Sequence, residues 1–157
     1  MLISGVVERF GLPGDGAGFR TPKGRLAIWT PAPGFVISRI TGLGDKAFTV
    51  PIIDAFDRAL PDELPIRLFF DVETIASYDS ELRTQLTARF YEERARIGEF
   101  HVLVGSKLTA MGVSVANLAL GGIVTSHTQR LQFVTAVDTA LIHAKVVKFS
   151  SSMLFAE

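Results

Sequence analysis

One apolar run, at residues 66–71, constrains the fold more than any other feature of the chain. Ile66, Leu68, Phe69 and Phe70 make it nearly continuous, which is typical of a strand covered on both faces within a mostly parallel sheet. Asp71 closes this strand. In open α/β sheets the carboxyl ends of the strands are where ligand sites lie, so Asp71 is a candidate site residue.

The remaining elements follow from apolar periodicity and from turn residues. Pro51 fits only the first turn of a helix, so that helix should begin near Thr49 or Val50. Further strands are expected at residues 2–10, 26–29, 34–40, 100–104 and 123–126, and helices at 51–60, 79–98, 108–120 and 131–142. The two strands at 26–40 should form an antiparallel hairpin. We therefore expect an α/β fold with a single-layer mixed, mostly parallel sheet of about five strands and four helices.

Three parts of the chain differ in character. Residues 1–25 are expected to be an N-terminal strand and loop extension, whose closely spaced glycines indicate a flexible turn. They lack the Gly-Lys-Ser/Thr ending of a phosphate-binding loop. Residues 26–145 should form the α/β domain. Residues 146–157 form a C-terminal tail that is too apolar for a free linker, and whether it docks or frays is open.

Composition narrows the class of protein. With 157 residues, the chain can bury roughly 70% of its unfolded surface without cross-links. Sixteen basic and sixteen acidic residues cancel, so the electrostatic signature of nucleic-acid binding is missing. There is no cysteine, and we see neither a signal peptide nor an 18-residue apolar stretch. We expect a cytoplasmic protein without membrane or nucleic-acid partners.

A dinucleotide-binding turn is the main false lead. GLGDKA, residues 42–47, fits the G-x-G-x-x-A pattern, and Asp71 ends the next strand as a ribose-binding acid would. However, Ser38 and Arg39 interrupt the preceding strand, which should be apolar throughout. Pro51 also places the helix start several residues after the glycines, whereas a pyrophosphate needs them directly at the helix N-terminus. We expect no cofactor.

Catalytic and metal-binding patterns are weak. His101, His127 and His143 are far apart in sequence and lack ligand spacing, so no metal site is expected. A hydrolase could use Ser80 or Ser106 with His127 and Asp71, but the chain lacks the G-x-S-x-G elbow. We assign no catalytic residue. The turn Gly105-Ser106-Lys107 could still bind an anion through backbone donors at a helix start.

The helix at 108–120 is unusually apolar. Leu108, Met111, Val115 and Leu118 share one face, and we expect that face to pack in the core. A homodimer contact or the wall of an apolar ligand site are the alternatives. On the preceding helix, Leu82, Leu86, Phe90 and Ile97 should point inward. The charges at 83, 89, 92, 93, 94 and 96 should form a solvated face with local pairs.

Residues 34–143 resemble the STAS family of anti-sigma-factor antagonists, including its SpoIIAA-like branch. In that family a strand ending in aspartate leads to Asp-Ser-Ser-Gly at a helix start, where the second serine is phosphorylated by a partner kinase. Phe70-Asp71 looks like that strand ending, and Asp79-Ser80-Glu81 falls where the motif belongs. Glu81 stands in place of the phosphoacceptor, where a fixed carboxylate favours the helix N-terminus and partly imitates phosphoserine. Ser80 is a substitute acceptor, although Asp79 and Ser80 fit a plain helix cap better.

The resemblance implies a regulatory module without enzymatic activity. Its docking region for a protein partner would comprise Asp71, the segment Tyr78, Asp79, Ser80, Glu81 and Arg83, and the nearby turn at Gly105, Ser106 and Lys107. The implied partner is a kinase or another signalling protein, or a second copy of the chain. The competing function is a carrier in which the sheet and the helix at 108–120 enclose a small, lipid-like apolar ligand.

Overall fold

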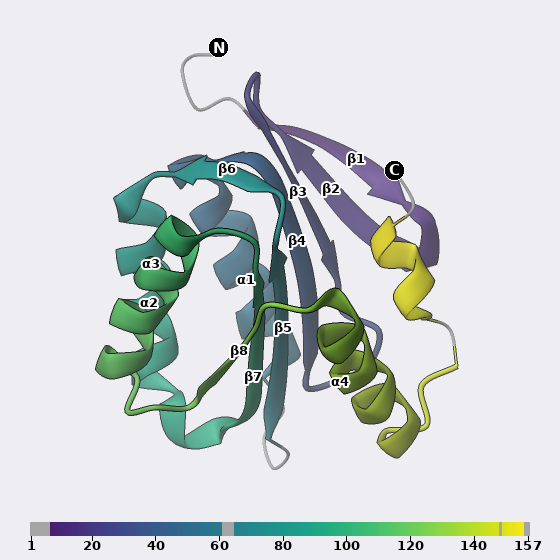
Figure 1. The fold of residues 1–157 in the computed structure, drawn as a ribbon. Coiled ribbons are helices and arrows are strands. Elements are labelled where there is room, and N and C mark those ends of the chain that lie inside the picture. Colours follow the sequence, from purple (N-terminus) through teal and green to yellow (C-terminus); the bar gives the residue numbers. More distant parts are fainter. Residues whose placement is uncertain (1–6, 61–64, 148, 156–157) are drawn as a thin grey trace.

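The computed structural model describes residues 7–60, 65–147 and 149–155. It shows a single twisted sheet with helices on both faces. Helices α1, α2 and α3 cover one face, and α4 with the C-terminal segment covers the other (Figure 1). The strands are β1 (Glu8–Leu12), β2 (Gly16–Arg20), β3 (Gly24–Trp29), β4 (Phe35–Gly44), β5 (Ile66–Val72), β6 (Ile75–Tyr78), β7 (Ile97–Val104) and β8 (Val124–His127). The α-helices are α1 (Thr49–Ala59), α2 (Ser80–Glu92), α3 (Lys107–Ala119) and α4 (Arg130–His143).

The sheet combines an antiparallel half with a parallel half. Its order is β1-β2-β3-β4-β5-β7-β8, and β6 pairs with the end of β4. The pairs from β1 to β4 are antiparallel, whereas β4, β5, β7 and β8 run parallel. The expected mixed, mostly parallel α/β class and the hairpin of β3 and β4 are confirmed. The expected number of strands is wrong, because the described sheet has eight strands rather than about five.

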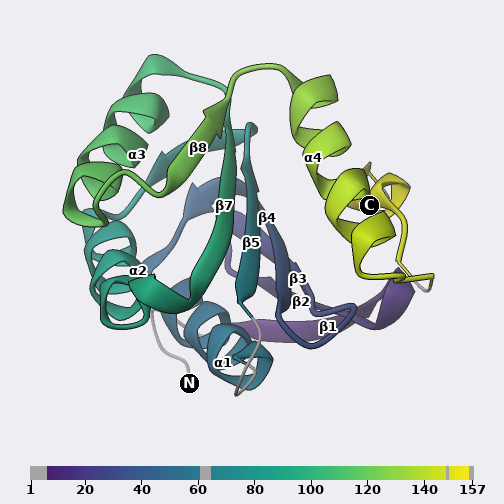
Figure 2. The ribbon, with the colours of Figure 1, turned by 90° about the horizontal axis from the view of Figure 1, so that it is seen from below.

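Two separate cores lie on the two faces of this sheet, which Figure 2 shows from below. Strand β5 contributes to both, because Leu68 and Phe70 face the helices α1–α3 while Phe69 faces α4. All three side chains are buried, as expected for a strand covered on both faces. The alternation assigns Asp71 to the α4 side, where it is fully buried.

Helix α1 begins at Thr49, as Pro51 predicts, and α2 ends earlier than expected. A 3-10 turn, Arg94–Arg96, follows α2, and Ile97 already belongs to β7. Ile97 is buried as expected, but in a strand rather than in the helix.

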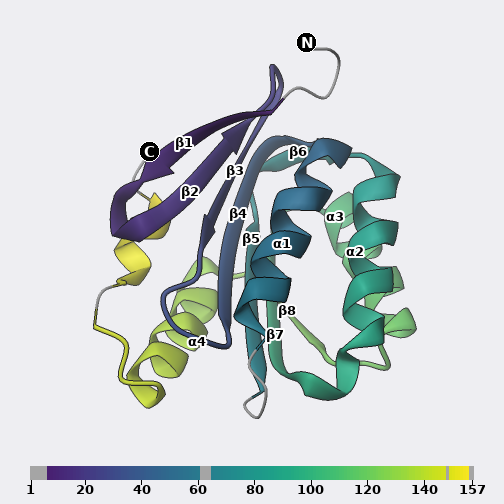
Figure 3. The same ribbon diagram turned by 180° about the vertical axis from the view of Figure 1, so that it is seen from behind.

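The glycine-rich segment is part of the sheet, which corrects the expected flexible turn. Strands β1 and β2 form an antiparallel hairpin, visible from behind in Figure 3. A Cβ at Gly18 would collide with the ring of Phe10, and one at Gly16 would collide with Trp29. The glycines therefore allow aromatic rings to lie flat against the strand backbone.

The C-terminal segment docks on the sheet through Phe149 and Leu154, which are both buried. Arg39 Nη1 donates a hydrogen bond of 2.7 Å to the carbonyl oxygen of Leu154. Within the described residues, no helix is both long enough and apolar enough to cross a membrane.

Candidate functional site

An apolar cavity of about 120 Å³ lies between α2, α3 and the sheet. Its walls include Ile40 from β4, Phe70 from β5, Phe90 from α2, Val102 from β7 and Val113 from α3. Almost all of the lining is apolar. A concave space of this size with almost entirely apolar walls marks a candidate binding site for a small molecule.

The cavity exists because α3 turns its small residues toward the sheet. Thr109 and Gly112 are its buried residues, and Ala116 lines the cavity. The large side chains that we expected in the core point outward instead: Leu108, Met111, Val115 and Leu118 are 61%, 66%, 53% and 82% exposed. The core prediction for this face is therefore wrong. Tyr78 lies against Gly112 and leaves no room for a larger side chain on the inner face.

The polar side chains that line the cavity include Tyr78, at the end of β6, and Arg83, on α2. A Cβ built on Gly112 would lie 3.0 Å from Cζ of Tyr78 and 3.5 Å from Cδ of Arg83, so both side chains converge on Gly112. Nε of Arg83 is buried and has no hydrogen-bond partner among the described residues. The expected solvated role of this charge is therefore only partly correct.

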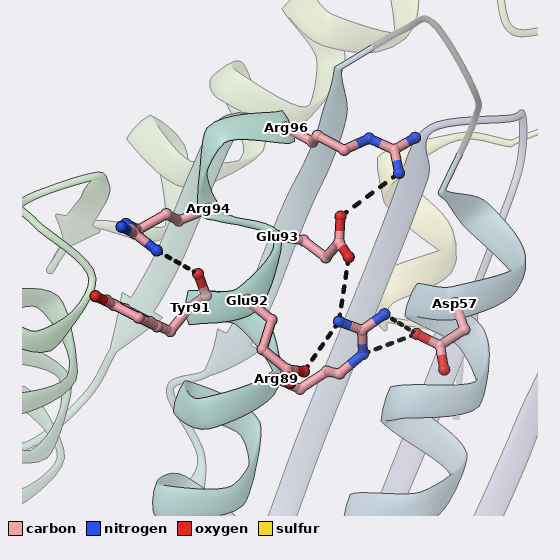
Figure 4. A network of polar contacts seen from close by, with 7 residues as sticks. All are labelled: Asp57, Arg89, Tyr91, Glu92, Glu93, Arg94 and Arg96. Carbon is pink, nitrogen blue, oxygen red and sulfur yellow. Dashed lines mark hydrogen bonds and ion pairs between the residues drawn. The ribbon is translucent and has the colours of Figure 1, made fainter.

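Helix α2 is anchored at its other end by a network of charges (Figure 4). Arg89 reaches Asp57 of α1 at 2.9 Å and Glu92 at 3.2 Å, and Glu93 also contacts Arg96 at 3.5 Å. Burial alone would lower the pKa of Arg89, but its hydrogen bonds and ion pairs, chiefly with Asp57, hold that pKa above its ordinary value. The expected local pairs are thus present on this face, and they fix α2 to α1.

The residues of the motif predicted at the start of α2 lie in two different environments. Ser80 and Glu81 are exposed in the first turn. Asp79 occupies the cap position but makes no side-chain cap to α2. Its Oδ2 accepts a hydrogen bond of 2.8 Å from the backbone amide of Lys46 instead. The expected plain cap is therefore corrected: Asp79 ties the α2 start to the turn that precedes α1.

The turn before α3 is a true helix cap. The Ser106 hydroxyl accepts a hydrogen bond of 3.2 Å from the amide of Thr109, and Lys107 is exposed. A Cβ on Gly105 would collide with the carbonyl of Glu73, so glycine is needed for close backbone approach. Since β5 and β7 are parallel, this turn and the start of α2 lie at the same edge of the sheet.

Asp71 lies at that edge on the opposite face, away from the cavity. Its Oδ2 accepts a hydrogen bond of 2.6 Å from Arg130 Nη2, and Arg39 Nε lies 3.9 Å away. Arg130 also reaches Glu73 at 2.7 Å. Burial alone would lower the pKa of Arg130, but the bonds to both carboxylates raise it overall. The group joins β5 to the first turn of α4.

The structure pairs two histidines that are far apart in the sequence. His101 Nδ1 and His127 Nε2 are 2.9 Å apart, and His101 Nε2 lies 3.1 Å from Glu99 Oε1. If Glu99 accepts from His101, then His127 donates to His101. Burial, followed by the charge on His101, lowers the pKa of His127. Parallel pairing of β7 with β8 brings them together, and no local motif signals it.

The imagined hydrolytic relay does not form among the described residues. Asp71 pairs with Arg130, His127 with His101, and the Ser106 hydroxyl with that of Thr109 at 3.0 Å. The dinucleotide-type turn is likewise different, because Gly42 and Gly44 belong to strand β4 and Gly42 pairs with Gly24 of β3.

Comparisons with known proteins assign no family to this chain. No family model matches the chain, and no curated protein matches it significantly. One similar solved structure is an uncharacterized protein of the DUF3478 family with a SpoIIAA-like fold, from Shewanella loihica PV-4. It is 8% identical, with a TM-score of 0.47, and the match covers 74% of this chain and 94% of that one.

Proposed function

We propose that this protein is a non-enzymatic module that binds a small apolar molecule between α2, α3 and the sheet. The cavity of about 120 Å³ carries this proposal. An engineered cavity of about 150 Å³ with similar apolar walls in another protein stays dry and takes up benzene. Space of the present size therefore suits a hydrocarbon group of about six carbon atoms.

Filling the cavity tests this function. Ala116 lines the cavity, whereas Ala119 of the same helix is exposed. Ala116→Leu should occupy the space, and Ala119→Leu is its matched control. We expect benzene or 1-hexanol to raise the melting temperature of the wild type and of the control, since a ligand of the folded state stabilises it. Ala116→Leu should lose that response. A wild type indifferent to every such probe would contradict the proposal.

A second candidate function is docking through the outer face of α3. Leu108, Met111, Val115 and Leu118 follow the a and d spacing of two heptads, which suits packing against another helix. Residues 108–120 contain no charged residue, so the same face on a second copy would meet no like-charge repulsion. We take the second copy as its partner. Ser80, Glu81 and Lys107 are exposed at the adjoining sheet edge and would border this contact.

Self-association is measured by sedimentation velocity. Leu118→Lys places a charge at the most exposed residue of the face and should convert a dimer into monomers. Ile142→Lys, at a 74% exposed position on α4, is the matched control. A wild type that sediments as a monomer at high concentration excludes the second copy as partner.

A further inference from the structure

Arg83 is the one charged residue among the described residues that line the cavity. Its Nε is buried, so solvent does not reach it, and no described residue accepts its hydrogen bond. A buried donor left without an acceptor is costly for the folded protein. An oxygen atom supplied by a ligand would remove that cost.

The shape of the Arg83 guanidinium group favours a carboxylate as the ligand group that supplies this oxygen. Arg presents its N–H donors in a rigid planar fork that matches the two oxygens of a carboxylate. No carboxylate among the described residues forms an ion pair with Arg83. The Tyr78 hydroxyl converges on the same point beside Gly112 and offers a further donor.

The other residues that line the cavity determine the chemical nature of the other end of the ligand. Phe70, Phe90 and Phe100 line the cavity together with aliphatic side chains, and none of these offers a hydrogen-bond donor to an anion. Phe90 lies 5.4 Å from Phe100 and 5.8 Å from Phe70 between ring centroids, which makes a firm aromatic wall. A ligand that uses both surroundings has one charged end and one compact hydrocarbon end.

We propose that the cavity binds a small carboxylic acid of about six to eight carbons, with its carboxylate on Arg83 and its hydrocarbon part among the aromatic side chains. This inference rests on the proposed apolar-ligand function and adds the chemical class of the ligand. Arg83 then determines specificity, because it separates an acid from a neutral molecule of equal size.

Hexanoate and 1-hexanol are suitable probes because they share a hydrocarbon chain and differ in charge. Both are titrated calorimetrically into the wild type, Arg83→Met and Lys107→Met. Arg83→Met keeps the apolar stem and removes the fork. Lys107→Met removes an exposed positive charge at the same sheet edge. We expect Arg83→Met to bind hexanoate at least about tenfold more weakly than the wild type, with the affinity for 1-hexanol changed less than about twofold.

The controls separate the two proposals. Lys107→Met should bind hexanoate like the wild type, and Arg83→Lys, which keeps the charge but not the fork, should be intermediate. Equal hexanoate affinity in the wild type and Arg83→Met, with 1-hexanol still bound, overturns the role of Arg83 and leaves the cavity function standing. An equal loss in Lys107→Met also overturns it. Failure of both probes to bind the wild type overturns both proposals.

Discussion

The ring of Tyr78 lies against Gly112, so the inner face of α3 touches the segment before α2 through a position that has no side chain. This contact brings the end of β6 against α3 at the border of the cavity. Gly112→Ala should gain about 1 kcal/mol of helix propensity but lose about 1–3 kcal/mol by overpacking against Tyr78. The net free energy of unfolding should therefore fall, as measured by urea denaturation. Ser114→Ala, on the exposed side of α3, should cause no loss.

Combining Gly112→Ala with Tyr78→Phe tests the cause of that loss. Removing the hydroxyl should recover part of it, since the hydroxyl oxygen is the atom closest to the added methyl group. Simple additivity of the two changes would contradict a direct contact.

Because α3 turns its large apolar face outward, truncating two nearby leucines should have very different effects on stability. Leu118 is 82% exposed and Leu120 is 2% exposed. Leu118→Ala should change the unfolding free energy by less than about 0.5 kcal/mol, whereas Leu120→Ala should lower it by about 2–5 kcal/mol. Urea denaturation of both variants is the measurement. A large loss from Leu118→Ala in a dilute, monomeric sample would show that this side chain is buried.

The ion pair between Asp71 and Arg130 should add little net stability, but the loss of only one of the two partners should destabilise the protein. Arg130→Met leaves a fully buried carboxylate without its closest partner and should cost about 3 kcal/mol, the lower end for buried pairs, because the Arg130 side chain is 24% exposed. Adding Asp71→Asn should restore most of this loss. The control Glu73→Gln removes the more exposed partner of Arg130 and should cost less than about 1 kcal/mol. Independent losses in the double variant would exclude this coupling.

His127 should make stability depend on pH. Its pKa is lowered in the folded protein, so below about pH 6.5 the unfolded chain takes up a proton that the folded chain resists. The free energy of unfolding should therefore fall as the pH decreases from 6.5 toward the lowered pKa, and level off below it. His127→Gln should flatten this part of the profile. Urea denaturation across this range checks the slope, and an NMR titration of the His127 ring checks the pKa.

The elements that can be predicted from the sequence are those whose own residues determine their structure. Strand β5 is recognisable because its apolar run needs cover on both faces, and α1 because Pro51 fixes its start. Strand β6, with the sequence IASY, was missed because it is short and only partly apolar. The hairpin of β1 and β2 was missed because its glycines serve ring packing, which a turn pattern does not distinguish.

The candidate site depends on relationships that the local sequence does not contain. Apolar periodicity identifies α3 but assigns its outer face to the core, since the inner face owes its fit to Gly112 and Tyr78. Arg83 was predicted as a site residue from its place near a motif, yet its buried Nε depends on the packing of α2 beside α3. The His101–His127 pair depends on the register of β7 and β8.

The two cores on opposite faces of the sheet are built from different helices and terminal segments. The cavity is lined by residues from α2, α3 and the strands, and by none of the described residues of α4 or the C-terminal segment. The α4 side is closed partly by a hydrogen bond between residues 115 positions apart, Arg39 and Leu154. Contacts so distant in sequence cost more chain entropy to close than contacts between elements that are nearer in sequence. We therefore expect that the C-terminal segment can detach from the sheet without changing the walls of the cavity.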